Sequence, residues 1–322
     1  MGHYIVLDLE WNQSSGGRET SMDRLPFEII EIGAVKLDGN LRIISEFSRL
    51  VRPQVYKTLH YKISEVTHLS QEKLEQQGER FEKAMEEFLD WCGKDFVFCT
   101  WGMQDLMELQ RNMRYYSLLD LLPGPVIYYD IQKLFSWFNE NIKLRRSLEY
   151  AIDCLDIEKE KDFHRALEDA EYTARVFAKL DMAEILPYYS IDTYQPPNNR
   201  KKEIYISYPT YDKYISRQFH DREKVIKDRE VASTRCPVCH LPAKRRLRWF
   251  MNNSRIYESI SQCQEHGYIK GKVRIRKTDE DMFYAVKTLK PVNEQKAEEI
   301  RQKRDSLRRK RKMKYNSDKQ IG

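Results

Sequence analysis

The sequence predicts an α/β domain with a mixed sheet flanked by helices, followed by a small β-rich domain. Three strand-like segments open the chain, and helical and strand-like segments then alternate, the order expected for helices packed on a mixed sheet. A linker rich in proline and asparagine follows, and beyond it four cysteine and histidine residues lie in a strand-rich segment. At 322 residues, the chain is long enough for two such domains.

The opening segments predict an antiparallel meander. Residues His3–Trp11 form a short apolar run with β-branched side chains, as in a buried strand. A second strand is expected over Glu28–Leu37, and the Asp38-Gly39 turn connects it to a third over Leu41–Val51.

Helices and strands alternate after this meander. A helix is expected from Ser70, which is placed as its N-cap, to about Trp91. A short apolar strand over Asp95–Thr100 then leads into a helix that continues through Arg114. The remaining expected elements are a strand over Ile127–Asp130, a helix over Ser147–Leu155 and an amphipathic helix over His164–Ile185.

The two halves of the chain carry opposite charge. Residues 1–190 contain 23 Lys and Arg against 33 Asp and Glu, a formal charge of −10, whereas residues 191–322 contain 33 against 17, a formal charge of +16. Because a separated charge of this size attracts a polyanion, nucleic acid is the simplest partner for the basic half. We expect an acidic domain over 1–190, a linker and charged connector over 191–235, a β-rich domain over 236–292 and a basic tail over 293–322.

Other features predict a cytoplasmic protein. No run approaches about 18 apolar residues, which argues against a transmembrane helix, and no apolar signal core precedes Asp8. Without a secretory signal, the six cysteines are expected to be reduced thiols or metal ligands. Three of them, Cys92, Cys99 and Cys154, are predicted to be small buried side chains.

Two acids on the first predicted strand form a candidate site. Asp8 and Glu10 are two residues apart, so both side chains leave the same face of the sheet. Neighbouring carboxylates on a buried strand repel each other, and Mg²⁺ or Mn²⁺ removes this cost because hard cations prefer oxygen ligands. The alternative is a strand end at which both carboxylates face water.

Two later segments extend this pattern. Asp105 follows a predicted strand and begins a helix, and His164 precedes Asp169 by five residues near another helix start. These residue types, in this order and context, resemble the DEDDh exonucleases of the DnaQ-like superfamily, and the resemblance covers about residues 1–185. Supporting stretches are Glu28–Val35, Val51–Pro53, and Thr67–Ser70 leading into Phe81 and Phe88.

The form Trp101-Gly-x-x-Asp105 is similar to the subgroup that trims RNA 3′ ends and to its bacterial relatives. His68 departs from the pattern, because family members usually have glycine there. The resemblance implies a ribonuclease-H-like fold and a metal-dependent 3′–5′ exonuclease that acts on single-stranded nucleic acid or 3′ overhangs. RNA is favoured over DNA as substrate, and the products would be nucleoside 5′-monophosphates.

The resemblance also implies roles for individual residues. His164 would be the general base, since an imidazole with a pKa of about 6.5 accepts a proton near neutral pH. Leu9 and Trp11 flank the acid pair where family members hold the terminal nucleotide, and Trp101 is a third candidate contact. Core packing explains Trp11 equally well and is slightly favoured for Trp101. The carboxylates implied to hold two Mg²⁺ or Mn²⁺ ions are Asp8, Glu10, Asp105 and Asp169.

Two short motifs in the second half predict one structural zinc ion. Cys236 and Cys239 form one pair, Cys263 and His266 form the other, and each pair is separated by two residues, as in a zinc ribbon. His240 adjoins Cys239 and would need a strained chelate to replace a ligand. The zinc is interpreted as structural because no water-activating group accompanies the site.

Strands around these motifs carry basic side chains beside aromatic ones, which suits phosphates and unstacked bases. The alternative is a protein-binding ribbon with a solvated basic face. The tail over Arg308–Lys312 needs no fold to attract phosphates. Candidate nucleic-acid contacts are Lys244, Arg245, Arg246, Arg248, Lys272, Arg274 and Arg276.

A second functional hypothesis is a catalytically weak regulatory module that binds nucleic acid or protein. The complete set of four acids argues against it, because a decayed site usually loses a carboxylate. The choice between RNA and DNA depends on contacts to the 2′-hydroxyl.

Overall fold

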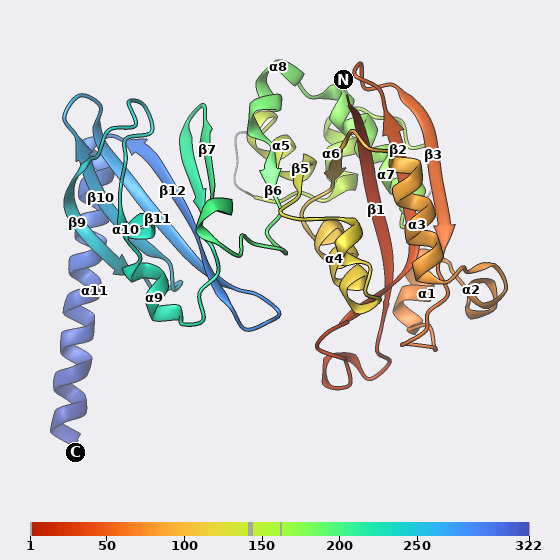
Figure 1. The fold of residues 1–322 in the computed structure, drawn as a ribbon, viewed down its shortest axis with the longest axis horizontal. Coiled ribbons are helices and arrows are strands. Elements are labelled where there is room, and N and C mark those ends of the chain that lie inside the picture. The colour runs from red at the N-terminus through yellow and green to blue at the C-terminus, as the bar shows by residue number, and fades with distance from the viewer. Residues whose placement is uncertain (1, 141–143, 162, 322) are drawn as a thin grey trace. The chain divides into compact units, whose positions relative to one another are not determined.

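The computed structural model describes residues 2–140, 144–161 and 163–321. They form two compact units, Met1–Gln195 and Pro196–Gly322, and each unit contains one six-stranded sheet (Figure 1). Within the described ranges, no helix is both long and apolar enough to cross a bilayer.

The first unit is built on a mixed sheet with strand order β3-β2-β1-β4-β5-β6. The predicted meander is confirmed, because β1 pairs antiparallel with β2, and β2 pairs antiparallel with β3. Strands β4 and β5 continue the sheet parallel to β1, which places β1 near its centre. The strands are β1 (His3–Gln13), β2 (Phe27–Leu37), β3 (Ile43–Leu50), β4 (Phe96–Thr100), β5 (Ile127–Asp130) and β6 (Ser190–Ile191).

Helices cover both faces of this sheet, as the sequence predicted. Helices α3 and α4 pack on one face, and α5, α6 and α7 pack on the other (Figure 1). The α-helices of the unit are α1 (Tyr61–Thr67), α2 (Gln71–Gln77), α3 (Phe81–Cys92), α4 (Gln104–Tyr115), α5 (Ile131–Phe138), α6 (Leu148–Cys154), α7 (Ala166–Lys179) and α8 (Met182–Ile185).

Two helices predicted as continuous are divided. The helix expected from Ser70 to Trp91 breaks after α2, because the backbone of Glu79 hydrogen-bonds to Leu50 and Arg52 at the end of β3. The helix expected over His164–Ile185 begins at Ala166 and ends at Lys179, and α8 follows with the Asp181 side chain as its N-cap. The first break comes from a tertiary contact and the second coincides with a local cap, and hydrophobic periodicity encodes neither.

His68 ends α1 with a φ of 57°, in the left-handed region. This conformation explains why glycine is usual here in the family that the sequence resembles, since glycine adopts it without steric cost. The loop after α1 therefore has the left-handed turn that glycine usually forms, although His68 occupies the position.

The second unit contains an antiparallel sheet with strand order β7-β8-β12-β11-β10-β9. Residues 203–235 belong to the segment expected to be a linker and charged connector (191–235), but they hold two short helices and the strands β7 and β8, which join this sheet. The tail is helical as α11, because Ala297 and Ile300 pack against Leu247 and Ile260. The elements are β7 (Ile204–Tyr208), β8 (Tyr211–Ile215), α9 (Arg222–Lys227), α10 (Arg229–Ala232), β9 (Lys244–Met251), β10 (Tyr257–Cys263), β11 (Gly267–Lys277), β12 (Phe283–Val292) and α11 (Glu294–Ile321).

Candidate active site and zinc site

Three of the predicted carboxylates meet on one face of the first sheet. Asp8 and Glu10 on β1 and Asp169 on α7 each place one oxygen within 4.8 Å of the others. Gly33 on β2 pairs with Asp8, and a Cβ at Gly33 would lie 2.1 Å from backbone atoms of Ala166 and Leu167. The missing side chain therefore lets the start of α7, which carries Asp169, rest directly on the sheet beside the acid pair.

Asp105 approaches the same place from α4. It lies in the first turn of that helix, just after β4, the parallel neighbour of β1, and only 6% of it is exposed. Its carboxylate accepts a hydrogen bond from the backbone of Leu9, and its charge acts on both Asp8 and Glu10. Four acids from three distant segments thus share one electrostatic environment.

Burial, followed by mutual repulsion, opposes ionisation of these four groups. Burial raises the pKa of Glu10 to about 8, and Asp169 and Glu31 add to the shift. Burial likewise raises the pKa of Asp105 to about 7 and that of Asp169 to about 6. The pKa of Asp8 is raised well above its usual range by burial and by Asp105. A cation among them would reverse this cost.

Asp169 has an oxygen available for such a cation. Its Oδ2 atom accepts a hydrogen bond of 3.1 Å from the backbone N–H of His164. Its Oδ1 atom is buried and has no hydrogen-bond donor among the described residues. Hard carboxylate oxygens without donors fit Mg²⁺ or Mn²⁺, the ions expected for this site.

His164 lies just before α7, exposed, with a φ of 69°. The next residue anchors it: Arg165 forms a two-pronged ion pair with Glu31 of β2, at 2.6 and 3.1 Å. Glu31 is 1% exposed and pairs with Glu10 across β1 and β2. Sequence periodicity did not reveal this ion pair, although an acid in the middle of a buried strand indicates that a cation lies nearby.

The three candidate nucleotide contacts lie in packed surroundings. Leu9 is 3% exposed and belongs to the core under α3 and α4, so it points away from the acid pair. Trp11 is partly buried against the same core, 5.9 Å from the Phe27 ring. Trp101 donates a hydrogen bond of 3.2 Å to the carbonyl of Arg146.

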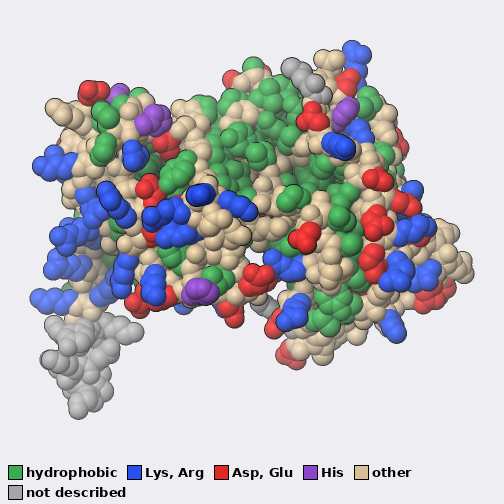
Figure 2. Space-filling view, in the orientation of Figure 1, with side chains coloured by type: hydrophobic (Ala, Val, Ile, Leu, Met, Phe, Trp, Pro, Cys, Tyr) green, Lys and Arg blue, Asp and Glu red, His purple; other side chains and the backbone are tan. Residues whose placement is uncertain are grey.

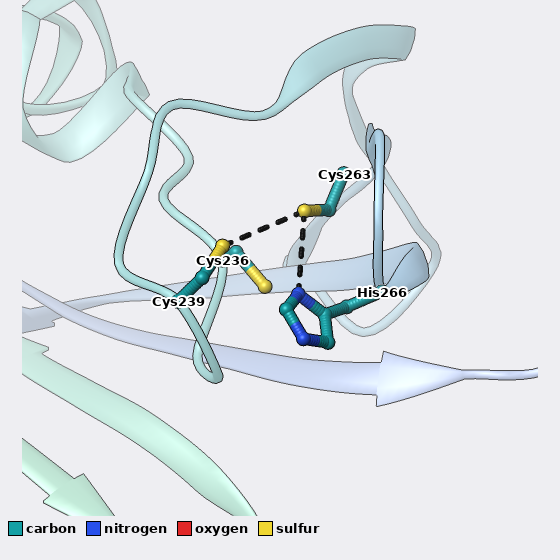
Figure 3. A group of neighbouring side chains, drawn as sticks. All are labelled: Cys236, Cys239, Cys263 and His266. Carbon is teal, nitrogen blue, oxygen red and sulfur yellow. Dashed lines mark hydrogen bonds between the residues drawn. The ribbon is translucent and has the colours of Figure 1, made fainter.

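The four predicted zinc ligands converge in the second unit (Figure 3). The Cys263 sulfur lies 3.6 Å from the Cys239 sulfur and 3.6 Å from Nδ1 of His266. Tetrahedral zinc with ordinary bond lengths separates two sulfurs by about 3.8 Å, and sulfur from nitrogen by about 3.6 Å. Backbone N–H groups of His266 and Glu265 lower the pKa of Cys263 to about 6, which favours the thiolate that zinc needs. The cluster fits one structural zinc ion.

The other cysteines differ from the prediction at one position. Cys92 and Cys99 are buried, but Cys154 is exposed. Cys154 is the last residue of the short helix α6, and its side chain faces outward there.

The predicted basic contacts are divided between two strands. Those on β9, an edge strand, are exposed, and two of them are engaged: Arg245 donates to the Ala232 carbonyl and Arg246 donates to Gln262. Lys272, Arg274 and Arg276 lie on β11, and the two arginines line a groove. The other two predicted contacts on β9 are Lys244 and Arg248.

A sequence comparison identifies the first unit. The Exonuclease family (RNase_T) matches residues 5–177, more than half of the chain, and the matched range contains all four acids and His164.

Relatives agree with this match. A PolC-type DNA polymerase III from Thermotoga maritima is 30% identical over 182 residues, which are 55% of this chain and 12% of that protein. The DNA polymerase III subunit epsilon of Aquifex aeolicus is 26% identical over 201 residues, 60% of this chain and 87% of that one. The chain thus spans only about an eighth of the length of the PolC-type relative.

Among solved structures, the nuclease domain of 3′hExo, described as a DEDDh family member bound to rAMP, matches with a TM-score of 0.50 and 20% identity. The match covers 59% of this chain and 96% of that one, and it establishes the ribonuclease-H-like exonuclease fold of the first unit. The chain belongs to the exonuclease family.

Proposed function

We propose that the first unit is a metal-dependent 3′–5′ exonuclease that acts on single-stranded nucleic acid, or on 3′ overhangs, and releases nucleoside 5′-monophosphates. The convergence of Asp8, Glu10 and Asp169, with a buried Asp169 oxygen that lacks a donor, carries this proposal. RNA is the favoured substrate because the Trp101-Gly-x-x-Asp105 form resembles enzymes that trim RNA 3′ ends.

Each residue has a distinct part in the proposed reaction. Asp8, Glu10, Asp105 and Asp169 would hold two Mg²⁺ or Mn²⁺ ions. When bound, these ions supply Lewis acidity at the scissile phosphate and make water a stronger acid. His164, which is exposed and whose backbone hydrogen-bonds to Asp169, accepts the proton of the attacking water, and Arg165 fixes the His164 segment through Glu31. Cys236, Cys239, Cys263 and His266 would hold one structural zinc ion in the second unit.

Release of labelled mononucleotides from matched RNA and DNA oligonucleotides tests the proposal, with 3′ ends free or blocked. We expect release that requires Mg²⁺ or Mn²⁺ and a free 3′ end, and that is faster on RNA. Asp8→Asn should lower the rate by at least about 10³-fold. The exposed Glu46→Gln variant is the control and should leave the rate unchanged.

Other outcomes have definite meanings. Unchanged release by Asp8→Asn refutes the assignment of the site. Tight binding without release, under every metal condition, favours the regulatory binding module instead.

A further inference from the structure

A groove in the second unit gathers cations from three separate segments. Its volume is about 510 Å³, and it is lined by Arg222 at the start of α9, by Arg255 in the turn between β9 and β10, and by the end of β11. The β11 residues are Arg274, Arg276 and Lys277. No Asp or Glu belongs to its lining among the described residues. Lys and Arg side chains gather over the second unit in Figure 2.

Among the described residues, four of the five groove cations lack an ion pair, unlike three other cations of this unit. Arg217 is paired with Glu203 and Asp228, and both Lys270 and Lys303 are paired with Glu258. By contrast, the four arginines of the groove form no ion pair within the described part of the chain. Lys277 alone is paired, with Asp281. Concentrated and uncompensated charge in a concave site is unfavourable unless an anion occupies it.

The local sheet geometry keeps the groove open. Strand β10 pairs with β11 only as far as Val273, and β11 then continues to Lys277 with β12 as its sole neighbour. Arg274 and Arg276 leave the same face, about 6.8 Å apart along the strand, which is comparable to the phosphate repeat of an extended nucleic-acid strand. Ile275 and Phe283 also line the groove, but both are partly buried and pack against the core formed by Val225, Val273 and their neighbours.

We propose that this groove binds the sugar-phosphate backbone of a single nucleic-acid strand, whatever its sequence. Guanidinium groups form paired hydrogen bonds with phosphate oxygens in a fixed planar geometry, which suits them to a sugar-phosphate backbone. The inference rests on the proposed function for the identity of the strand as substrate. The proposed site includes Arg222 and Arg255 in addition to the predicted β11 arginines. Strand periodicity in the sequence could not show that these two residues lie near β11.

The test uses the full chain with Asp8→Asn, which prevents hydrolysis, and fluorescence anisotropy with a labelled single-stranded RNA of about 20 nucleotides. Replacing Arg255, Arg274 and Arg276 with Gln should raise the Kd by at least about 10-fold and reduce the salt slope by about 2, near 0.7 for each lost phosphate contact. The control replaces the exposed Lys201, Lys202 and Lys290 with Gln, removes the same charge, and should change the Kd less than 2-fold.

An equal loss of RNA affinity in the groove variant and in the control variant overturns the inference. If the chain binds duplex RNA as tightly as the single strand, the single-strand assignment is overturned. If polyglutamate displaces the labelled RNA as effectively as unlabelled RNA does, the partner of the groove is an acidic protein and not nucleic acid. The p-nitrophenyl ester of thymidine 5′-monophosphate is too small to reach the groove. With Asp8 intact, the parent chain and the groove triple variant should therefore hydrolyse it at the same rate. If this hydrolysis is absent but the groove substitutions still weaken RNA binding more than the control substitutions, the proposed function is refuted while the inference about the groove is supported.

Discussion

At the scale of single residues, the Arg165–Glu31 ion pair connects the buried sheet to the exposed histidine. Arg165→Gln leaves Glu31 charged and unpaired at a site that is 1% exposed, so we expect a loss of about 3 kcal/mol in unfolding free energy. It should also lower kcat more than it raises KM, because the His164 segment loses its anchor. Chemical denaturation and steady-state kinetics measure the two effects.

The double variant Glu31→Gln/Arg165→Gln separates these effects. It should recover most of the stability, since no charge is stranded, but not the rate. A double variant with the parent kcat would show that the pair has no positioning role. Arg175→Gln is the matched control, because its ion pair with Glu160 is solvent-exposed and contributes about 0–1 kcal/mol.

Glu10 makes metal-free stability depend on pH. Its pKa is about 8 in the folded state and about 4.3 in an unfolded chain, so the folded state keeps the proton between these values. Stability without metal should therefore be greatest below about pH 4 as far as Glu10 contributes, and should fall as the pH rises to about 8.

Thermal unfolding of zinc-loaded protein freed of Mg²⁺ and Mn²⁺, measured at several pH values, checks this sign. Glu10→Gln should flatten the profile and stabilise the metal-free protein at pH 8 by about 2 kcal/mol, whereas the exposed Glu46→Gln should not. Adding Mg²⁺ to the parent chain should restore stability. A parent profile that rises from pH 5 to 8 contradicts the expectation.

At the scale of elements, the close approach of α7 to β2 sets the site. Gly33→Ala puts a Cβ into the backbone of Ala166 and Leu167, so α7 must shift and carry Asp169 with it. We expect the Mg²⁺ concentration for half-maximal activity to rise and kcat to fall by about 10²-fold.

Ala34→Gly on the same strand is the control, because Ala34 faces the core under α3. It should destabilise the unit without changing the metal requirement. Equal effects of the two variants on metal requirement would show that Gly33 has no special role in placing α7.

The elements that could be predicted are those specified by local sequence patterns. Strands β1 to β5 and the N-cap at Ser70 were recognisable because apolar periodicity and capping are local. The division of the helix expected to begin at Ser70 depends on the pairing of Glu79 with the end of β3, which is a tertiary contact. Strands β7 and β8 are short and rich in tyrosine, so only the pairing of β7 with β8 and of β8 with β12 identifies them.

The same distinction applies to the sites. Asp8, Glu10 and the cysteine motifs were visible because their spacing within a strand or a knuckle carries the chemistry. Glu31 and the groove residues Arg222 and Arg255 were missed because they depend on strand register and on where β10 stops pairing.

At the scale of the whole molecule, each unit offers ligands suited to a different metal. The first presents carboxylate oxygens, which select hard ions, and the second presents three sulfurs and one imidazole, which select zinc. Because the zinc ligands connect the Cys236 loop to the ends of β10 and β11, zinc should be needed for the second unit to stay folded.

Zinc loss should therefore unfold the two units unequally. Purified protein should contain one zinc ion per chain by elemental analysis, and Cys263→Ser should lose it. In hydrogen exchange, peptides from β10 and β11 should lose protection in this variant, whereas those from β1 and β2 should keep theirs, because β1 and β2 belong to the other compact unit. The exposed Cys154→Ser is the matched control and should retain both zinc and protection. Retained protection of β10 and β11 in zinc-free protein would contradict a structural role for zinc, and the stability of the second unit would then have to come from its sheet and the packing of α11 alone.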